Sequence, residues 1–529
     1  MYSSGETRPR ATPAMAAVSA CSCLRIKPLR RIRLRTDQRR VEVGGTARRA
    51  CLRENPYLGP LLRTMRAGSA ALGRGVPPTA DTVWDSSTKQ QRSMRAGQSR
   101  QPVLRLVAHP GNGTLLAPSG CAVKPPARGG ACEQAAARAR SPAMPARTER
   151  AIELLLAFAG RTGLGSSCRP QRYLWTDAFA VCTLLGLGHA TGESRFAELA
   201  LRLVDEVHHV LGRHRADDTR TGWISGLPEA DGAAHPTCGG LRIGKPLPER
   251  GPREPLDERL EWDRDGQYFH YLTKWMHALD QATRSSGRLR FTTWARELAH
   301  AAHRAFTYVP RPGGPPRMYW KLSIDLSRPL VESMGQHDPL DGYVACIQLD
   351  ATAPGATPSL REAIAGFAAM IDARSLATGD PLGLGGLLAD AHRLAQLAGH
   401  GADTDGLVEA LLAAALAGLR QYAGQSDLRA PAHHRLAFRE LGLAIGLAAI
   451  EPAAWREASD GVRARVDRLA RYVPLRAEIE AFWLEPEHRR VATWLEHENI
   501  NDVMLATSLA PEGFLRLGSV PRSPRVPVD

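Results

Sequence analysis

Apolar residues recur at helical spacing along most of the chain between residues 149 and 509. A spacing of three and four residues places them on one face of an α-helix, whereas a half-buried strand would show strict alternation. Strand signals are few, and the best are 222–227 and 317–326, both in long connections. The pattern predicts about twelve helices, over 149–160, 176–190, 193–214, 264–283, 290–308, 339–351, 360–374, 384–398, 404–422, 434–449, 455–481 and 489–509.

The connections between these helices alternate in character. Those that enter every second helix are rich in polar residues and glycine, with the segments QRYLWTDAF, LEWDRDGQY, GQHDPLDGY, TGDPLGLGG, HHRLAFREL and EHENINDVM. Consecutive antiparallel helices place alternate N-termini at the same end of a bundle. Six such pairs closed into a ring would gather these connections on one rim. The sequence therefore predicts an all-α (α/α)6 toroid over residues 148–510, with six inner and six outer helices and a flexible tail over 511–529.

The net charge of +15 comes entirely from the first 147 residues. That segment has 26 Lys+Arg against 7 Asp+Glu, a net charge of +19, whereas the remainder has 43 against 47, a net charge of −4. It shows no sustained apolar period, and high charge with low hydrophobicity is typical of disordered chains. We therefore expect residues 1–147 to form a disordered, Arg-rich segment.

Three hypotheses account for this basic segment. It could be an arm that binds nucleic acid or an anionic membrane, or an organelle-targeting extension, which is typically Arg-rich and poor in acids. The third hypothesis is a start codon placed too far upstream, and it is the one that we favour. Met144 stands immediately before the first helical pattern, and it would begin a protein of 386 residues, Met144 to Asp529.

The positions of the cysteines and the length of the apolar runs limit which compartment and which cofactors we expect. Five of the nine cysteines lie in the basic segment, and Cys168, Cys182, Cys238 and Cys346 are far apart and form no CxxC pair. We therefore expect no zinc or disulfide framework. No apolar run approaches the length of about 20 residues that a membrane span needs. The sequence thus predicts a cytoplasmic protein without a membrane partner, a metal or another cofactor, and it leaves the oligomeric state open.

The segment EWDRDGQYFHYLTKWMHALD, residues 261–280, concentrates chemistry in a short stretch. Asp263 or Asp265 alone could be an ordinary helix N-cap. Glu261, Asp263 and Asp265 packed together are harder to explain by capping, because like charges raise one another's pKa. A carboxyl kept protonated beside an ionised one is what acid–base chemistry on sugars needs. Asp263 and Asp265 are therefore candidate catalytic acids.

Polar side chains recur along the same predicted helix. Gln267, His270, Lys274 and His277 fall on one stripe, which could face water or line a cavity. Eleven of the 30 aromatic residues lie between Trp262 and Trp320, a concentration that suits a pocket with apolar faces and polar tips. This interpretation gives His270 a role in positioning hydroxyls or relaying protons. It makes Trp262, Tyr268, Trp275 and Gln267 candidate substrate-binding residues.

Other candidates lie where other inner helices would begin. His337 and Asp338 precede the helix over 339–351, although Asp338 and Pro339 also form an ordinary helix start. Asp177 lies in WTDAF, where Thr176 could serve as the cap. His497 and Asn499 lie in HENIND at the last inner helix. In the long connection over 215–262, Arg242 and Lys245 could reach over the cavity and hold a carboxylate or phosphate of the substrate.

The helix count and the segments WTDAF, EWDRDGQYFHYLTKWMHAL, GQHDPLDG and HENINDVML resemble the six-hairpin glycosidase superfamily. That group includes unsaturated glucuronyl hydrolases and, on a related toroid, the N-acylglucosamine 2-epimerases. The resemblance covers residues 148–510 and concerns the fold and the placement of the site; no diagnostic catalytic motif of one family is present. Related toroids have other functions, so the fold alone does not give the function.

The leading hypothesis is a glycoside hydrolase that acts on a small carbohydrate substrate with paired carboxylates. Asp265 or Asp263 would be the general acid, and Asp338 or Asp177 the second carboxylate. If His270 and His337 transfer the protons instead, the reaction would be an epimerisation or isomerisation. A toroid that binds a ligand without catalysis is the third alternative, and nucleic acid is not the expected partner.

Overall fold

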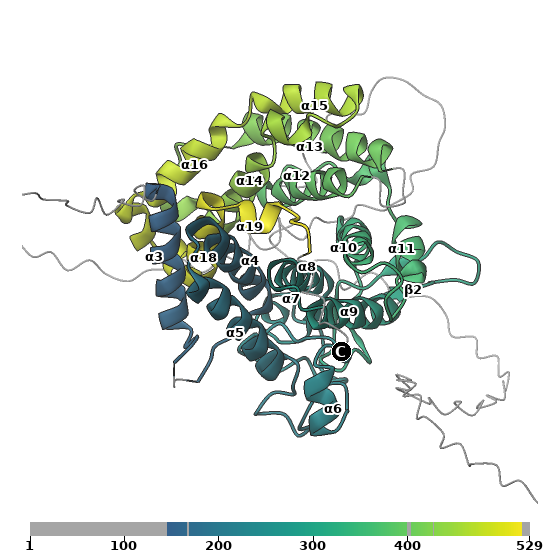
Figure 1. Ribbon diagram of the computed structural model, residues 1–529. Helices are drawn as coiled ribbons and strands as arrows, with labels where there is room; N and C mark the ends of the chain where they lie inside the picture. Colours follow the sequence, from purple (N-terminus) through teal and green to yellow (C-terminus); the bar gives the residue numbers. More distant parts are fainter. Residues whose placement is uncertain (1–144, 167–168, 399–403, 427, 521–529) are drawn as a thin grey trace, which may run out of the picture. The chain divides into compact units, whose positions relative to one another are not determined.

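The computed structural model describes residues 145–166, 169–398, 404–426 and 428–520, which all belong to one compact unit. Within it, six helices contact one another in chain order, and the cycle closes where the last contacts the first (Figure 1). These inner helices are α4 (Leu174–Thr191), α8 (Phe269–Ser286), α10 (Asp338–Thr352), α12 (Pro381–Gln396), α14 (Ala437–Ala448) and α18 (Glu498–Leu509).

Each inner helix also packs against an outer helix. The outer helices are α3 (Ala146–Arg161), α5 (Ser194–Leu211), α9 (Arg290–Phe306), α11 (Arg361–Ala368), α13 (Asp405–Gln425) and α16 (Pro474–Leu484). A further helix, α15 (Asp460–Ala470), packs on α13. Inner and outer helices alternate along the chain, so the predicted all-α (α/α)6 toroid is confirmed.

Burial patterns explain why these helices lie where they do. In α4 every residue from Leu174 to Leu185 is buried, as expected of a helix that is apolar all round. Helix α5 instead buries a single stripe at spacings of three and four: Phe196, Ala200, Leu203, Val204, Val207, His208 and Leu211. A helix with one apolar stripe covers the ring from outside, whereas a helix without a polar face needs neighbours on every side.

Glycines allow two inner helices to approach closely. A Cβ added to Gly385 of α12 would lie 2.0 Å from the carbonyl oxygen of Gly442, and one added to Gly446 would lie 2.5 Å from the Cα of Gly385. Both contacts are with backbone atoms, which cannot move aside independently. Glycine at these positions therefore sets the spacing between α12 and α14.

Short elements fill the connections on the rim. Strands β1 (Gln267–Tyr268), β4 (Lys321–Leu322) and β5 (Pro329–Val331) form an antiparallel sheet, and β2 (Thr307–Tyr308) pairs with β3 (Arg317–Met318). The remaining short elements are α6 (Glu229–Ala234), α7 (Glu258–Glu261), α17 (Ala492–Leu495), α19 (Glu512–Leu515), and the 3₁₀ turns η1 (Ala373–Ser375), η2 (Ala432–His434), η3 (Pro452–Trp455) and η4 (Pro486–Arg490).

Several predicted elements differ in the structure. The helix predicted over 264–283 begins only at Phe269, because Gly266 at φ +145° and the pairing of β1 with β4 keep the preceding residues extended. The helices predicted over 455–481 and 489–509 are each interrupted, the first before Pro474. The strand predicted over 222–227 is wrong, since that segment contains an isolated bridge between Arg213 and Trp223.

Residues 511–520, the described part of the tail predicted over 511–529, pack against the inner helices instead of forming a flexible tail. The Phe514 carbonyl oxygen lies 2.9 Å from His277 Nε2, and Gln281 Nε2 donates to the Gly513 and Arg516 carbonyls. Phe514 also stacks on Phe179, with ring centroids 4.5 Å apart. The basic segment up to residue 144 lies outside the described residues. Among those described, no helix has the length and apolarity to cross a bilayer.

Candidate functional site

A cavity of about 910 Å³ lies within the ring of inner helices. All six inner helices contribute residues from near their N-termini: Trp175 from α4, His270 from α8, Asp338 from α10, Gly383 from α12, Phe438 from α14 and Glu498 from α18. Phe514 of α19 also lines the cavity. The prediction that the N-termini of the six inner helices gather around one cavity is therefore confirmed.

Asp338 and Asp341 lie one turn apart on α10, and both line the cavity. Asp338 is buried and accepts a hydrogen bond of 3.1 Å from the Gly335 N–H. Burial, with the charge of Asp341 as a second cause, raises the pKa of Asp338 to about 8. Asp338 is therefore a protonated acid at neutral pH.

Asp341 has the opposite electrostatic environment. Its Oδ1 lies 3.1 Å from Lys274 Nζ, and its carboxylate also bonds to the side chain of Asp390. Burial alone would raise the pKa of Asp341, but Lys274, the bond to Asp390 and the charge of Arg393 outweigh it and lower that pKa. The cavity thus holds a neutral carboxyl beside an ionised one.

Asp390 and Arg393 form a buried ion pair on α12. Burial raises the pKa of Asp390 to about 7 against the opposing effect of Arg393, so its proton can be shared with Asp341. Neither Asp390 nor Arg393 is a candidate site residue on the sequence alone. The signal that could have identified them is the presence of two charged residues within the predicted helix over 384–398, which is otherwise mostly apolar.

Two cavity histidines come from different elements. His270 stacks on Trp320 with ring centroids 5.9 Å apart, and its Nδ1 lies 3.9 Å from Asp338 Oδ1. Burial lowers the pKa of His270 to about 4. His337 Nε2 lies 2.8 Å from the Leu376 carbonyl oxygen, which makes Nε2 the protonated nitrogen, and burial also lowers its pKa. Both imidazoles are therefore neutral at pH 7.

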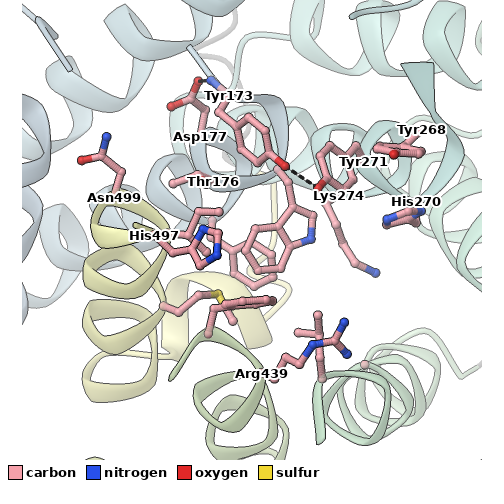
Figure 2. A pocket seen from close by; sticks show the side chains of 18 of the residues that line it. Tyr173, Thr176, Asp177, Tyr268, His270, Tyr271, Lys274, Arg439, His497 and Asn499 are labelled. Atoms are coloured by element: carbon pink, nitrogen blue, oxygen red, sulfur yellow. Dashed lines mark hydrogen bonds between the residues drawn. The ribbon is translucent and has the colours of Figure 1, made fainter. Parts of the chain in front are cut away.

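Asp177 anchors the start of α4 beside the cavity. Its Oδ2 accepts a hydrogen bond of 2.9 Å from the Tyr173 N–H, and Oδ1 lies 3.6 Å from the Arg172 guanidinium. Burial raises the pKa of Asp177 to about 7, although Arg172 opposes the shift. The Tyr173 and Tyr271 hydroxyls are 2.7 Å apart and join α4 to α8 (Figure 2).

Asp263 and Asp265 are not helix caps, because α8 begins after them. Asp263 is exposed and lines the cavity. Asp265 is fully buried away from the lining, 3.2 Å from Arg215 Nη1 and 2.9 Å from Arg242 Nη1. Its Oδ1 accepts a bond of 3.0 Å from the Gly244 N–H, next to Lys245. Asp265 and Arg242 therefore neutralise each other and support the loop that brings Lys245 to the cavity.

The predicted substrate-binding residues divide into two groups. Trp262, Tyr268 and Lys245 line the cavity, and burial lowers the pKa of Lys245. Trp275 is wholly buried and donates from Nε1 to His208 Nε2 at 3.1 Å. Gln267 is also buried and bonds only backbone atoms, those of Leu241, Gly239 and Ile324.

Three aromatic side chains that line the cavity pack against one another. Tyr268 packs on Trp320 with centroids 4.8 Å apart, and Trp262 meets Trp320 edge-on at 5.2 Å. Across the cavity, His497 and Asn499 come from the start of α18 and Arg439 from α14 (Figure 2). Asn499 Oδ1 accepts a bond of 3.0 Å from Arg161, and His497 Nε2 is buried without a hydrogen-bond partner among the described residues. These groups offer hydrogen bonds to a polar ligand.

No protein-family model and no curated protein matches the chain. Among solved structures, the chain is similar to the GH76 α-mannanase of Bacteroides thetaiotaomicron, with 10% identity and a TM-score of 0.42 over 69% of this chain and 96% of that one. It is also similar to the GH76A α-1,6-mannanase of a Salegentibacter species (10% identity, TM-score 0.39, 69% and 98% covered). The cellobiose 2-epimerase of Spirochaeta thermophila has 13% identity and a TM-score of 0.39, with 69% and 96% covered.

The TM-scores of these three structures lie below 0.5, so the assignment of the toroid rests on the helix contacts described above. Those contacts confirm the (α/α)6 toroid.

Proposed function

We propose that this protein is a carbohydrate-active enzyme that hydrolyses a glycosidic bond, with Asp338 as the general acid and Asp341 as the ionised carboxylate. The observation that carries the proposal is the opposite perturbation of two carboxyl groups in one cavity. Glycoside hydrolysis uses such a pair: one group protonates the leaving oxygen, and the other activates water or attacks the sugar. Environments that push two pKa values apart assign the two roles.

The lining suits a sugar ring. Tyr268, Trp262 and Trp320 present apolar ring faces with polar tips, which match the apolar faces and hydroxyl edges of a pyranose. Lys245, His497 and Asn499 add groups that can bond hydroxyls. The volume of about 910 Å³ lies within the range of small-molecule sites, about 300–1,000 Å³. The neutral His270 beside Asp338 would orient a hydroxyl rather than donate a proton.

A histidine-based epimerase is the second candidate function. Its support is His270 Nδ1, which is buried, has no hydrogen-bond partner among the described residues and lies beside the protonated Asp338. A neutral imidazole can remove a proton from a sugar carbon. The return of a proton on the other face needs a second acid, and the lowered pKa of His337 disfavours that role for it. Hydrolysis by Asp338 and Asp341 needs only one proton donor, and Asp338 is protonated at neutral pH. We therefore favour the hydrolase.

The test incubates the full chain with neutral, amino and uronic mono- and disaccharides in ¹⁸O-labelled water and identifies products by mass spectrometry and NMR. Hydrolysis adds one labelled water to the cleaved bond. Asp338→Asn keeps the shape of the side chain but removes the acid, so the rate should fall about 10²- to 10⁴-fold. Asp341→Asn should cause a loss of similar size.

Asp467→Asn is the control, because it removes an exposed carboxylate of α15 that does not line the cavity. Its rate should equal that of the wild type. A new isomer at unchanged mass would move the assignment to the epimerase. Saturable sugar binding without any product, by folded protein, would indicate a binding protein.

A further inference from the structure

Three side chains of metal-binding type meet on the outer side of the ring. His235 follows α6, Cys238 comes three residues later, and Glu297 lies on the outer helix α9. One donor atom from each lies within 4.8 Å of the other two. His235 Nδ1 is 2.6 Å from Glu297 Oε1. None of the three residues lines the toroid cavity, so the cluster is separate from the proposed active site.

The loop that carries His235 and Cys238 is held by further hydrogen bonds, one of which, a contact of 3.4 Å from Thr237 Oγ1, reaches Glu297 Oε2. Thr237 Oγ1 donates to the Trp294 carbonyl oxygen at 2.7 Å, and Trp294 Nε1 donates to the Ala234 carbonyl oxygen at 2.7 Å. These two bonds attach the loop to α9 on both sides of His235. The donors are therefore held near one another before any ion arrives, which lowers the entropic cost of binding.

We propose that His235, Cys238 and Glu297 bind a divalent transition-metal ion of the zinc class. Imidazole nitrogen, thiolate sulfur and carboxylate oxygen are the three donor types that Zn²⁺ takes, whereas Mg²⁺ and Ca²⁺ prefer oxygen alone. The side chain of His235 is 41% exposed and that of Glu297 is 10% exposed. An ion here can be reached from solvent, and water can fill the fourth tetrahedral position.

Binding requires a small local movement. Two ligands at about 2.0–2.1 Å from a tetrahedral Zn²⁺ lie about 3.3 Å apart. The His235 and Glu297 donors, now 2.6 Å apart, must separate by about 0.7 Å to reach that distance, and the partly exposed imidazole has room to do so. The ion replaces the proton between them, and Cys238 binds as a thiolate, so binding releases protons and weakens at low pH.

The consequence is structural. The loop that follows Cys238 contacts Gln267 through Gly239 and continues to Gly244 and Lys245 at the cavity. An ion that joins this loop to α9 would stabilise the folded protein. It would also restrict the movement of the loop that carries Lys245, without taking part in the reaction.

The test uses the full chain, stripped with a chelator and titrated with Co²⁺, which reports thiolate ligation by a charge-transfer absorption band. We expect one equivalent to bind with this band. Cys238→Ser should abolish the band and weaken Zn²⁺ binding roughly tenfold or more. His300→Ala, which removes an exposed imidazole one turn further along α9, should leave both unchanged.

A second measurement needs no variant. Zn²⁺ should slow alkylation of Cys238 in the wild-type protein at least several-fold, as quantified by mass spectrometry of the peptide that contains it. Absence of the Co²⁺ band, its persistence in Cys238→Ser, or unchanged alkylation of Cys238 with Zn²⁺ would each overturn the proposal. A band that persists would place the ion on other cysteines of the chain.

Discussion

At the scale of single residues, Asp338, Asp341 and Asp265 show how surroundings assign different roles to one side-chain type. Asp338 has no cation within bonding distance among the described residues and keeps its proton, whereas Asp341 has Lys274 at 3.1 Å and loses it. Asp265 bonds two arginines and lies outside the cavity lining. We therefore propose Asp338, rather than Asp265, as the acid.

Asp265→Asn is expected to act on stability. Removing one partner of a buried ion pair leaves an uncompensated charge and costs about 3–5 kcal/mol. The half-buried guanidinium groups of Arg215 and Arg242 would bear that cost. Denaturant unfolding should show a lower midpoint for Asp265→Asn and an unchanged midpoint for the exposed Asp263→Asn. Equal midpoints for the two variants would contradict the supporting role of Asp265.

At the scale of elements, periodicity predicted which helices exist but not where the helix that carries His270 begins. Aromatic and polar residues continue through 262–268 at a spacing that fits a helix, yet β1 pairs with β4 there. That pairing joins segments more than 50 residues apart, and local pattern contains no information about it. The predicted stripe of four polar residues is correct in part: His270 and Lys274 line the cavity, whereas Gln267 precedes α8 and His277 bonds Gln348 in the interior.

Two neighbouring glycines of α12 should respond to alanine in opposite ways. At Gly385 the new methyl group would meet the backbone of α14, which should destabilise the protein by at least about 1–3 kcal/mol. At Gly386 no atom beyond the local backbone of α12 lies within 4 Å of the added Cβ, so the higher helix propensity of alanine should stabilise the protein by about 0.5–1 kcal/mol. Thermal unfolding of both variants measures the difference. A similar change in both would contradict the close approach of α12 and α14.

At the scale of the whole molecule, closure of the helix ring brings the N-termini of six inner helices, far apart in the sequence, to one cavity. The alternation of connections was enough to predict the toroid and the rim that carries the site. It could not show that Asp390 and Arg393 of α12 reach the cavity, or that Phe514 lines it. Those placements depend on helix rotation and on packing of the chain end, which are set by contacts between distant segments.

Burial among the inner helices is also what makes Asp338 an acid. Its raised pKa comes first from burial, and burial exists only because the inner helices exclude water around it. Since the protonated form is the one that donates, turnover should be lost as the pH rises through about 8.

The central claim is that Asp338 is protonated at neutral pH. Difference infrared spectroscopy between the wild type and Asp338→Asn, recorded as the pH rises, detects the carbonyl stretch of a protonated carboxyl group. We predict a band at pH 7 that belongs to Asp338 and disappears with a midpoint near 8. A carboxylate already ionised at pH 7, with a midpoint near the ordinary value of about 4, would contradict the assignment of Asp338 as the general acid.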